Sequence, residues 1–212
     1  MQEITEKMNR RIDFFLPRGD ESTMLATLKQ IHDCPVVRAF FQEDIESLPS
    51  SQTMRSIASQ AKAEYTVLVT KPTTLVLGEG ALERMARAAD DSGAAMVYAD
   101  RIERKVEGEK WTDERHPVID YQLGAIRNDF DFGSVLLFRT SLLHQWAEAS
   151  ADTSYQYAGL YDLRLYLSRH GDLLHLNENI YTEVETDKGH DAFLGESEIL
   201  TGLLSNFMEH AL

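Results

Sequence analysis

The sequence predicts an α/β fold with an open, mostly parallel sheet flanked by helices. In the first hundred residues, short apolar runs alternate four times with longer segments whose apolar residues recur at helical spacing. The run at residues 65–70, Tyr-Thr-Val-Leu-Val-Thr, is mainly β-branched, as is typical of a parallel strand buried on both faces. Strands that alternate with helices predict parallel pairing through right-handed crossovers.

The elements of this first part follow from their apolar spacing and their flanking residues. Ser50 and Ser51 are suitable N-cap residues for one helix, and Gly93 is a suitable C-cap residue for another. The predicted strands are residues 12–16, 36–41, 65–70 and 95–98, and the predicted helices are one with Met24, Leu25, Leu28 and Ile31 on one face, then 52–63 and 80–92.

After Asp100 the chain no longer alternates regularly between predicted strands and helices. Residues 101–111 are polar and contain Gly108, which predicts a turn within a hairpin-like excursion. An irregular stretch is expected next, and the remaining elements are then predicted as a strand at 134–138, helices at 141–149 and 160–170, and late strands at 173–176 and 180–184.

The composition narrows the functional classes. The 212 residues include 21 Lys and Arg against 35 Asp and Glu, a formal net charge of −14, which disfavours nucleic acid as a partner. The single cysteine, Cys34, excludes an intramolecular disulfide, and the charged amino terminus does not resemble a signal peptide. No apolar run approaches the roughly 20 residues that span a bilayer. These features predict a cytoplasmic protein without a transmembrane segment.

Three segments in the second half carry a resemblance to a known family. They read Ala-Met-Val-Tyr-Ala-Asp at residues 95–100, Gly-Ser-Val-Leu-Leu-Phe-Arg at 133–139, and a helix over 160–170 that ends at Gly171. In this order they resemble the second half of a family 2 glycosyltransferase with the GT-A fold. The resemblance implies a GT-A-like domain over residues 1–187, which binds a nucleotide sugar over the first half of the sheet and an acceptor over the second.

Two acids match functional positions of that family. The resemblance implies that Asp162, near the start of the late helix, is the general base that deprotonates the acceptor hydroxyl. It also implies that Asp100, at the end of its strand, lies near the sugar. Each acid has a structural alternative, because acids often cap helix amino termini and often follow strands in turns.

The metal-binding DxD motif of the family is missing. Residues 68–74 read Leu-Val-Thr-Lys-Pro-Thr-Thr where the family carries it, and Lys71 and Pro72 cannot bind Mg²⁺ or Mn²⁺. A divalent metal stays possible, but the sequence assigns no metal ligand. Lys71 is instead a candidate for neutralising a diphosphate directly, because a lysine ammonium binds phosphate as a point charge.

The other candidate binding residues match the family loosely. Pro17 matches the proline after the first strand, and Glu43 or Asp44 could replace the acids that contact the nucleoside after the second. Asp129 and Asp131 alternate with phenylalanines before the strand at 134–138. They are candidates for binding sugar or acceptor hydroxyls, and the alternative is an acidic loop entering a core strand.

Two functions therefore stay open. The first is a glycosyltransferase-like protein that transfers a sugar from a nucleotide sugar to a glycan or other acceptor without the DxD metal site. The second is a non-catalytic, degenerate GT-A module for glycan binding or assembly, similar to the DxD-less first domain of bacterial tandem family 2 transferases. Residues 188–212 are predicted to include an amphipathic helix, which is expected to pack on this domain, on an adjacent transferase domain or in a homodimer.

Overall fold

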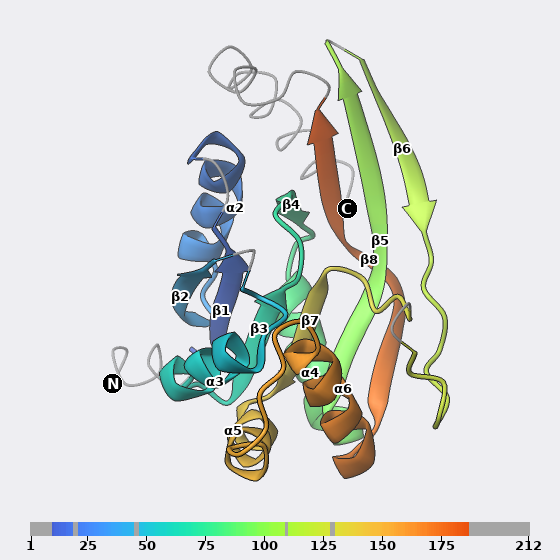
Figure 1. The fold of residues 1–212 in the computed structure, drawn as a ribbon. Helices are drawn as coiled ribbons and strands as arrows, with labels where there is room; N and C mark the ends of the chain where they lie inside the picture. Colours follow the sequence, from blue (N-terminus) through green and yellow to red (C-terminus); the bar gives the residue numbers. More distant parts are fainter. Residues whose placement is uncertain (1–9, 19–20, 45–46, 109, 128–129, 187–212) are drawn as a thin grey trace, which may run out of the picture.

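The computed structural model describes residues 10–18, 21–44, 47–108, 110–127 and 130–186, with only the backbone described for 21–26. Within these ranges eight strands form one curled sheet with the order β2-β1-β3-β7-β5-β8-β4, and β6 pairs with β5 (Figure 1). The strands are β1 (Ile12–Pro17), β2 (Val37–Glu43), β3 (Tyr65–Val69), β4 (Thr74–Leu77), β5 (Met96–Glu107), β6 (Lys110–His116), β7 (Val135–Arg139) and β8 (Leu173–Thr186).

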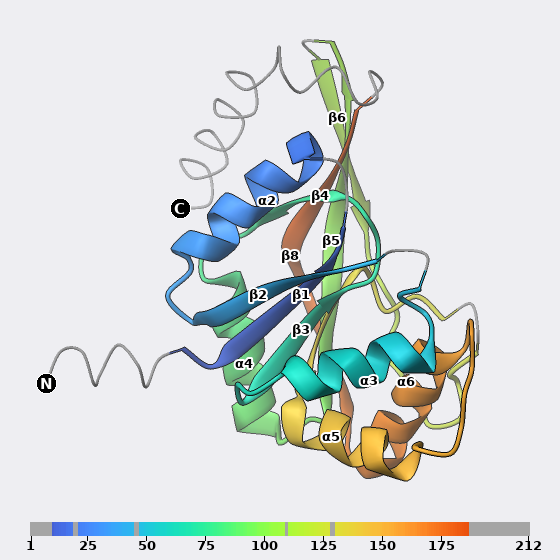
Figure 2. The ribbon, with the colours of Figure 1, turned by 60° about the vertical axis from the view of Figure 1, so that its left-hand side comes forward.

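Helices cover both faces of the sheet. Alternate residues of a strand face opposite sides, so Val67 of β3 joins the core on the side of α2 and α4, whereas Leu68 joins the core beneath α3, α5 and α6. Figure 2 shows these two layers. The described helices are α2 (Glu21–Asp33), α3 (Ser51–Gln60), α4 (Ala81–Ser92), α5 (Thr140–Ala149) and α6 (Gly159–His170). None of these helices is long and apolar enough to cross a membrane.

The predicted α/β fold is confirmed, but the sheet is mixed rather than mostly parallel. β1 pairs in parallel with β2 and β3, as does β5 with β8, whereas β7 lies antiparallel between β3 and β5. The reversal has a topological cause. β6 brings the chain back to the carboxyl edge of the sheet, opposite Arg101, so the segment from residue 117 to β7 starts at this edge and runs the other way.

Three strand predictions differ from the structure. β4 was not predicted: its four residues pair with β8, and α2 adds two hydrogen bonds, in which Thr27 Oγ1 accepts from the amide of Leu75 at 2.9 Å and Gln30 accepts from that of Leu77 at 2.8 Å. The stretch expected to be irregular from residue 112 begins as β6, which hydrogen-bonds to β5 along its length. The two late strands are one, β8, whose pairing with β5 shifts register on both sides of Asp100.

The caps predicted for two helices are confirmed. Ser50 Oγ accepts from the Thr53 amide at 3.0 Å at the start of α3, and Gly93 ends α4 with a φ of 73°. The start of α6 packs against this same α3 cap. The amide of Gly159 donates to the carbonyl of Pro49 at 2.7 Å, and the amide of Ser51 donates to the carbonyl of Tyr155 at 2.9 Å. This contact joins the first half of the chain to the second.

Candidate functional site

The candidate site lies at the carboxyl edge of the sheet, where β3 and the apolar half of β5 end and β7 begins. At its centre the guanidinium of Arg101 is only 5% exposed. It forms ion pairs with Glu103 at 2.9 Å, Asp131 at 3.1 Å and Glu183 at 3.4 Å. Glu183 also lies 3.8 Å from the ammonium of Lys71. We call these five residues the Arg101 cluster, and two of them, Lys71 and Asp131, were predicted site residues.

Arg101 and Asp131 hold each other in their charged forms. Burial by itself lowers the pKa of Arg101, but the carboxylates of Asp131 and Glu183 outweigh it and the pKa lies above its ordinary value. Burial by itself raises the pKa of Asp131, but the amide of Gly133 and the guanidinium of Arg101 outweigh it, so this pKa is lowered. Arg101 and Asp131 are therefore a pair of full charges of opposite sign at neutral pH.

The loop before β7 depends on Gly133 to place Asp131. The amide of Gly133 donates to Asp131 Oδ1 at 2.7 Å, and its φ of 73° is in the left-handed region that favours glycine. A Cβ at this position would also lie 2.6 Å from the hydroxyl of Tyr181. That hydroxyl accepts from the amide of Ser134 at 2.8 Å, so it fixes the loop against β8.

Asp100 does not join this cluster, because it faces the other side of β5. Its buried carboxylate accepts from the amide of Val118 at 2.8 Å and lies 2.8 Å from Nε2 of His175 on β8. The other ring nitrogen of His175 lies 2.7 Å from the exposed carboxylate of Asp120. Tyr98 stacks on the His175 ring with 5.2 Å between the ring centroids. We call Tyr98, Asp100, Asp120 and His175 the His175 clamp.

The His175 clamp holds one wall of an open hollow. The hydroxyl of Tyr98 donates to the carbonyl of Ile119 at 2.9 Å and accepts from the amide of Tyr121 at 2.8 Å. The hollow has a volume of about 540 Å³, and its wall is mainly apolar although Asp131 also lines it. The lining residues are Pro117, Val118, Ile119, Ala125, Arg127, Phe130 and Asp131.

The donor side of the edge has less free space beside Pro17. The described side chains around Pro17 leave no space there for a water molecule, although Lys71, which lines the same place, is itself half-exposed. Thr70, Lys71, Pro72 and Thr73 offer no anionic ligand, and the neighbouring acid, Glu183, is paired with Lys71 and Arg101. These residues do not fit a Mg²⁺ or Mn²⁺ ion, and the described part of the chain contains no other cluster of three potential ligands.

Two further predicted site residues lie outside the Arg101 cluster, and a third, Asp129, lies outside the described residues. Asp44 follows β2, an edge strand of the sheet, and its carbonyl accepts from the Ser47 hydroxyl at 3.1 Å. Asp162 accepts a hydrogen bond from the indole of Trp146 on α5 at 2.8 Å. It is Arg164 of α6 that reaches the loop before β7, with its guanidinium 5.2 Å from the centroid of the Phe132 ring.

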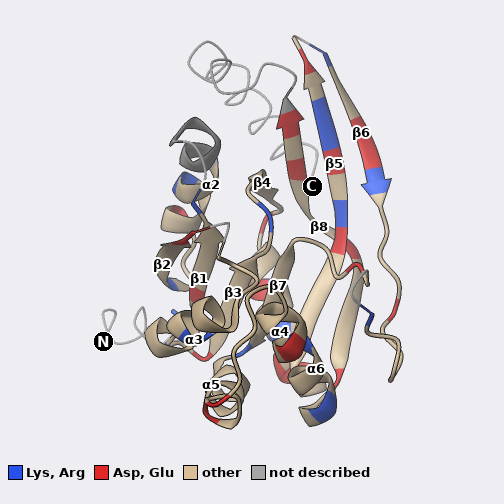
Figure 3. Ribbon diagram, viewed as in Figure 1, with Lys and Arg blue, Asp and Glu red and all other residues tan. Residues whose placement is uncertain are grey.

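Sequence reasoning did not single out Arg101, Glu183, Arg164 or His175. The sequence does contain a signal for Arg101. Arg101 and Glu103 are two residues apart directly after an apolar strand, so they lie on one face of the sheet if that strand continues. Figure 3 shows that acidic and basic residues alternate along this outer part of β5. No local signal connects Arg101 with Glu183, because 82 positions separate them in the chain.

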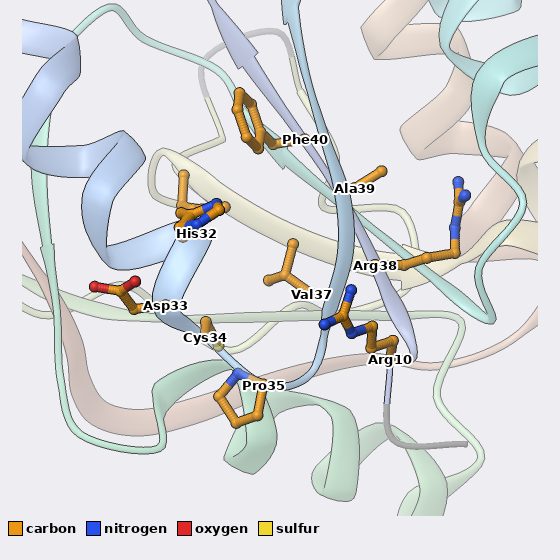
Figure 4. Close-up of a pocket in the computed structure, with 10 residues that line it drawn as sticks. Arg10, His32, Asp33, Cys34, Pro35, Val37, Arg38, Ala39 and Phe40 are labelled. Carbon is orange, nitrogen blue, oxygen red and sulfur yellow. The ribbon is translucent and has the colours of Figure 1, made fainter. Parts of the chain in front are cut away.

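A second hollow lies at the amino end of β2 and contains none of the predicted site residues. It measures about 500 Å³ between α2 and β2, and His32, Cys34 and Phe40 contribute to its wall (Figure 4). Arg38 also lines it, but its guanidinium is paired at 2.7 Å with the fully buried Asp13. That pairing gives Arg38 a structural role in holding β2 on β1.

Comparisons with known proteins support the fold. The sequence matches no protein-family model and no curated protein. The structure is similar to that of TarS 1–349 from S. aureus, with a TM-score of 0.51 and 10% identity over 82% of this chain and 60% of that chain. The chain thus spans about three fifths of the length of TarS 1–349. At this identity the likeness shows the fold alone, which is GT-A-like.

Two further structures overlap less well. TarS 1–349 in complex with UDP-GlcNAc aligns with a TM-score of 0.47 and 12% identity over 94% of this chain and 67% of that chain. The inositol-1-phosphate CTP transferase from T. maritima aligns with a TM-score of 0.45 and 14% identity over 93% of this chain and 78% of that chain.

Proposed function

We propose that this chain is a family 2-like glycosyltransferase that takes a sugar from a nucleotide sugar without a DxD-bound metal. The observation that carries the proposal is the position of Lys71 directly after β3, beside the Arg101 cluster, at the edge where ligands bind in open α/β sheets. The GT-A-like fold supports it, since crystal structures of TarS 1–349 contain UDP-GlcNAc or UDP. A nucleotide sugar is the proposed donor, and a glycan or another hydroxyl compound is the proposed acceptor.

The proposed reaction assigns a role to each half of the edge. Asp162 takes the proton of the acceptor hydroxyl, whose oxygen attacks the anomeric carbon of the donor. The bond from this carbon to the diphosphate oxygen breaks, and Lys71 neutralises the charge on the departing nucleoside diphosphate. Pro17 and Asp44 are proposed to lie along the donor, and Asp100, Asp129 and Asp131 along the transferred sugar or the acceptor.

A thermal-shift panel of UDP-, GDP- and TDP-sugars tests donor binding. A ligand that binds only the folded protein stabilises it by RT ln(1 + [L]/Kd). We expect at least one nucleotide sugar to raise the melting temperature equally in EDTA and in Mn²⁺, because no metal is proposed to bridge the diphosphate. A panel in which no nucleotide sugar shifts the transition would contradict donor binding.

Replacement of Asp162 tests the proposed base. We expect Asp162→Asn to slow the release of nucleoside diphosphate by about 100-fold or more, because a general base typically contributes that factor. Asp152→Asn, the same change at an exposed position between α5 and α6, is the matched control. If the two variants release product at the same rate, Asp162 is not the base.

The second candidate function is a non-catalytic GT-A module for glycan binding or assembly with a partner transferase. Two observations favour it: the carboxylate of Asp162 is already hydrogen-bonded to Trp146, and the described side chains leave no room for a water molecule beside Pro17. This function predicts stabilisation by glycans but by no nucleotide sugar in the same panel. Residues 188–212, where an adjacent domain or a second copy was expected to bind, lie outside the described residues, and a cytoplasmic location stays a prediction.

A further inference from the structure

Asp131 is the partner of Arg101 that can most easily be replaced. Its side chain is 58% exposed, against 28% for Glu103 and 10% for Glu183. Glu103 and Glu183 belong to β5 and β8, whose backbone hydrogen bonds fix them, whereas Asp131 lies on a loop and lines the open hollow. Of the three carboxylates, Asp131 is therefore the one that an incoming solute reaches first.

Two further cations near Asp131 have unused hydrogen-bond donors. Lys71 is half-exposed, and its ion pair with Glu183 is loose at 3.8 Å. Arg164 packs on Phe132, the residue after Asp131, and its Nε is shielded from solvent without a hydrogen-bond partner among the described residues. Burial lowers the pKa of this guanidinium to about 10, and only the nearby charge of Asp131 opposes that shift. A shielded guanidinium without an anion is unfavourable, so this position favours a negatively charged ligand.

We propose that Asp131 occupies an oxyanion site in the free protein, and that a phosphate or carboxylate group of the ligand displaces it from Arg101. The incoming oxyanion would accept from Nη1 of Arg101, which now donates to Asp131 at 3.1 Å, and from Lys71 and Arg164. Planar guanidinium groups and the ammonium of lysine both suit such oxygens. Because one anion replaces another, the charge of the buried Arg101 stays balanced.

This inference deepens the proposed function, on which it rests only for the identity of the ligand. The oxyanion has two possible sources, the diphosphate of a nucleotide donor and an acidic group on the acceptor. Both place a negative oxygen at the same cations, so the site itself can be tested with inorganic anions.

The test is a calorimetric titration with inorganic pyrophosphate in EDTA at constant ionic strength. We expect Asp131→Asn to bind pyrophosphate about ten-fold more tightly than the wild type, because the variant lacks the competing charge-assisted hydrogen bond. Asp152→Asn removes one exposed negative charge outside the hollow and should bind like the wild type. If Asp131→Asn binds pyrophosphate no better than Asp152→Asn, the proposal is wrong.

Two further variants test the cations without disturbing the buried Arg101. Lys71→Gln and Arg164→Gln should each weaken pyrophosphate binding several-fold in the Asp131→Asn background, and unchanged affinity in both would overturn the site. Titrations with UDP and with glucuronate then distinguish the sources: tighter binding of UDP indicates the donor diphosphate, and tighter binding of glucuronate indicates an acidic acceptor. If pyrophosphate binds as expected but no nucleotide sugar stabilises the protein, the proposed function fails while the oxyanion site stands.

Discussion

The two halves of the carboxyl edge differ in how much space they leave for a ligand. At the ends of β1 and β3, the described side chains leave no room for a water molecule beside Pro17, and Lys71 is half-exposed. At the start of β7 and beside the loop after β6, the protein has an open hollow of about 540 Å³. The family resemblance assigns the first half to the donor and the second to the acceptor, so this hollow lies on the acceptor side.

The difference follows from what covers each half. In the first half, side chains of α2 hydrogen-bond to β4, and Thr27 of α2 and Leu75 of β4 line the small space beside Pro17. In the second half, Tyr98 and Asp100 hold the backbone of the loop after β6 and His175 contacts the side chain of Asp120 in it, whereas Ile119 of this loop is 68% exposed. Helix side chains therefore fill space in the first half, whereas an apolar side chain stays exposed beside the hollow in the second.

The largest loss of stability is expected where α6, in the second half of the chain, packs against the α3 cap in the first half. A methyl group on Gly159 would overlap the backbone of Ser50 and Ser51, which belong to the α3 cap. Because neither backbone can move without breaking its hydrogen bonds, we expect Gly159→Ala to lower the free energy of unfolding by about 3 kcal/mol. Urea unfolding followed by circular dichroism measures this change.

The control for this substitution is Gly108→Ala at the tip of the β5–β6 hairpin. Gly108 has a φ of 62°, but a Cβ there would contact nothing within 4 Å, so the cost should be only the backbone strain of about 1 kcal/mol. Equal losses of unfolding free energy in the two variants would mean that the contact between α6 and α3 does not hold the two halves of the chain together.

An intermediate loss of stability is expected from substitutions in the His175 clamp, beside the open hollow. Asp100→Ala leaves the amide of Val118 and the ring of His175 without their buried acceptor, which should cost about 2 kcal/mol. Asp120→Ala removes the other carboxylate of the same clamp, but this side chain is 85% exposed and the loss should stay below about 0.5 kcal/mol. Chemical denaturation of both variants compares them, and similar losses would contradict a buried clamp.

The smallest change in stability is expected at the opposite edge of the sheet, where β3 begins at Tyr65. Hydrogen bonds from Arg11 and Tyr65 outweigh burial and lower the pKa of Asp90 from 3.8 to about 2. A lowered pKa stabilises the folded state above pH 3.8, and this contribution is lost as the pH falls towards 2. We expect Asp90→Asn to cost about 1 kcal/mol at pH 7, since the pair is partly exposed, and progressively less below pH 4. A difference between variant and wild type that stays constant from pH 7 to pH 2.5 would contradict this assignment.

Apolar spacing and capping residues predicted those parts of the fold that depend only on neighbouring residues in the chain. The apolar runs at Phe14, Val67 and Val97 became buried strands, and Ser50 and Gly93 became helix caps, because spacing and capping chemistry are properties of short segments. β4 could not be predicted in this way, since its four residues depend on pairing with β8 and on Thr27 and Gln30 of α2, all distant in the sequence. The direction of β7 depends on where the chain returns after β6, which no local pattern records.

The sequence by itself determined an α/β protein with alternating strands and helices, a net negative charge, and a lysine where the transferases that it resembles carry acids. The tertiary structure alone decided which charges meet. It brought Arg101, Asp131 and Glu183 from three separate segments into one ion-pair cluster, and it turned Asp100 and Asp162 towards His175 and Trp146 instead. Apolar periodicity is fixed by neighbours in the chain, whereas ion pairs are fixed by strand order and register, so only the folded chain shows the site.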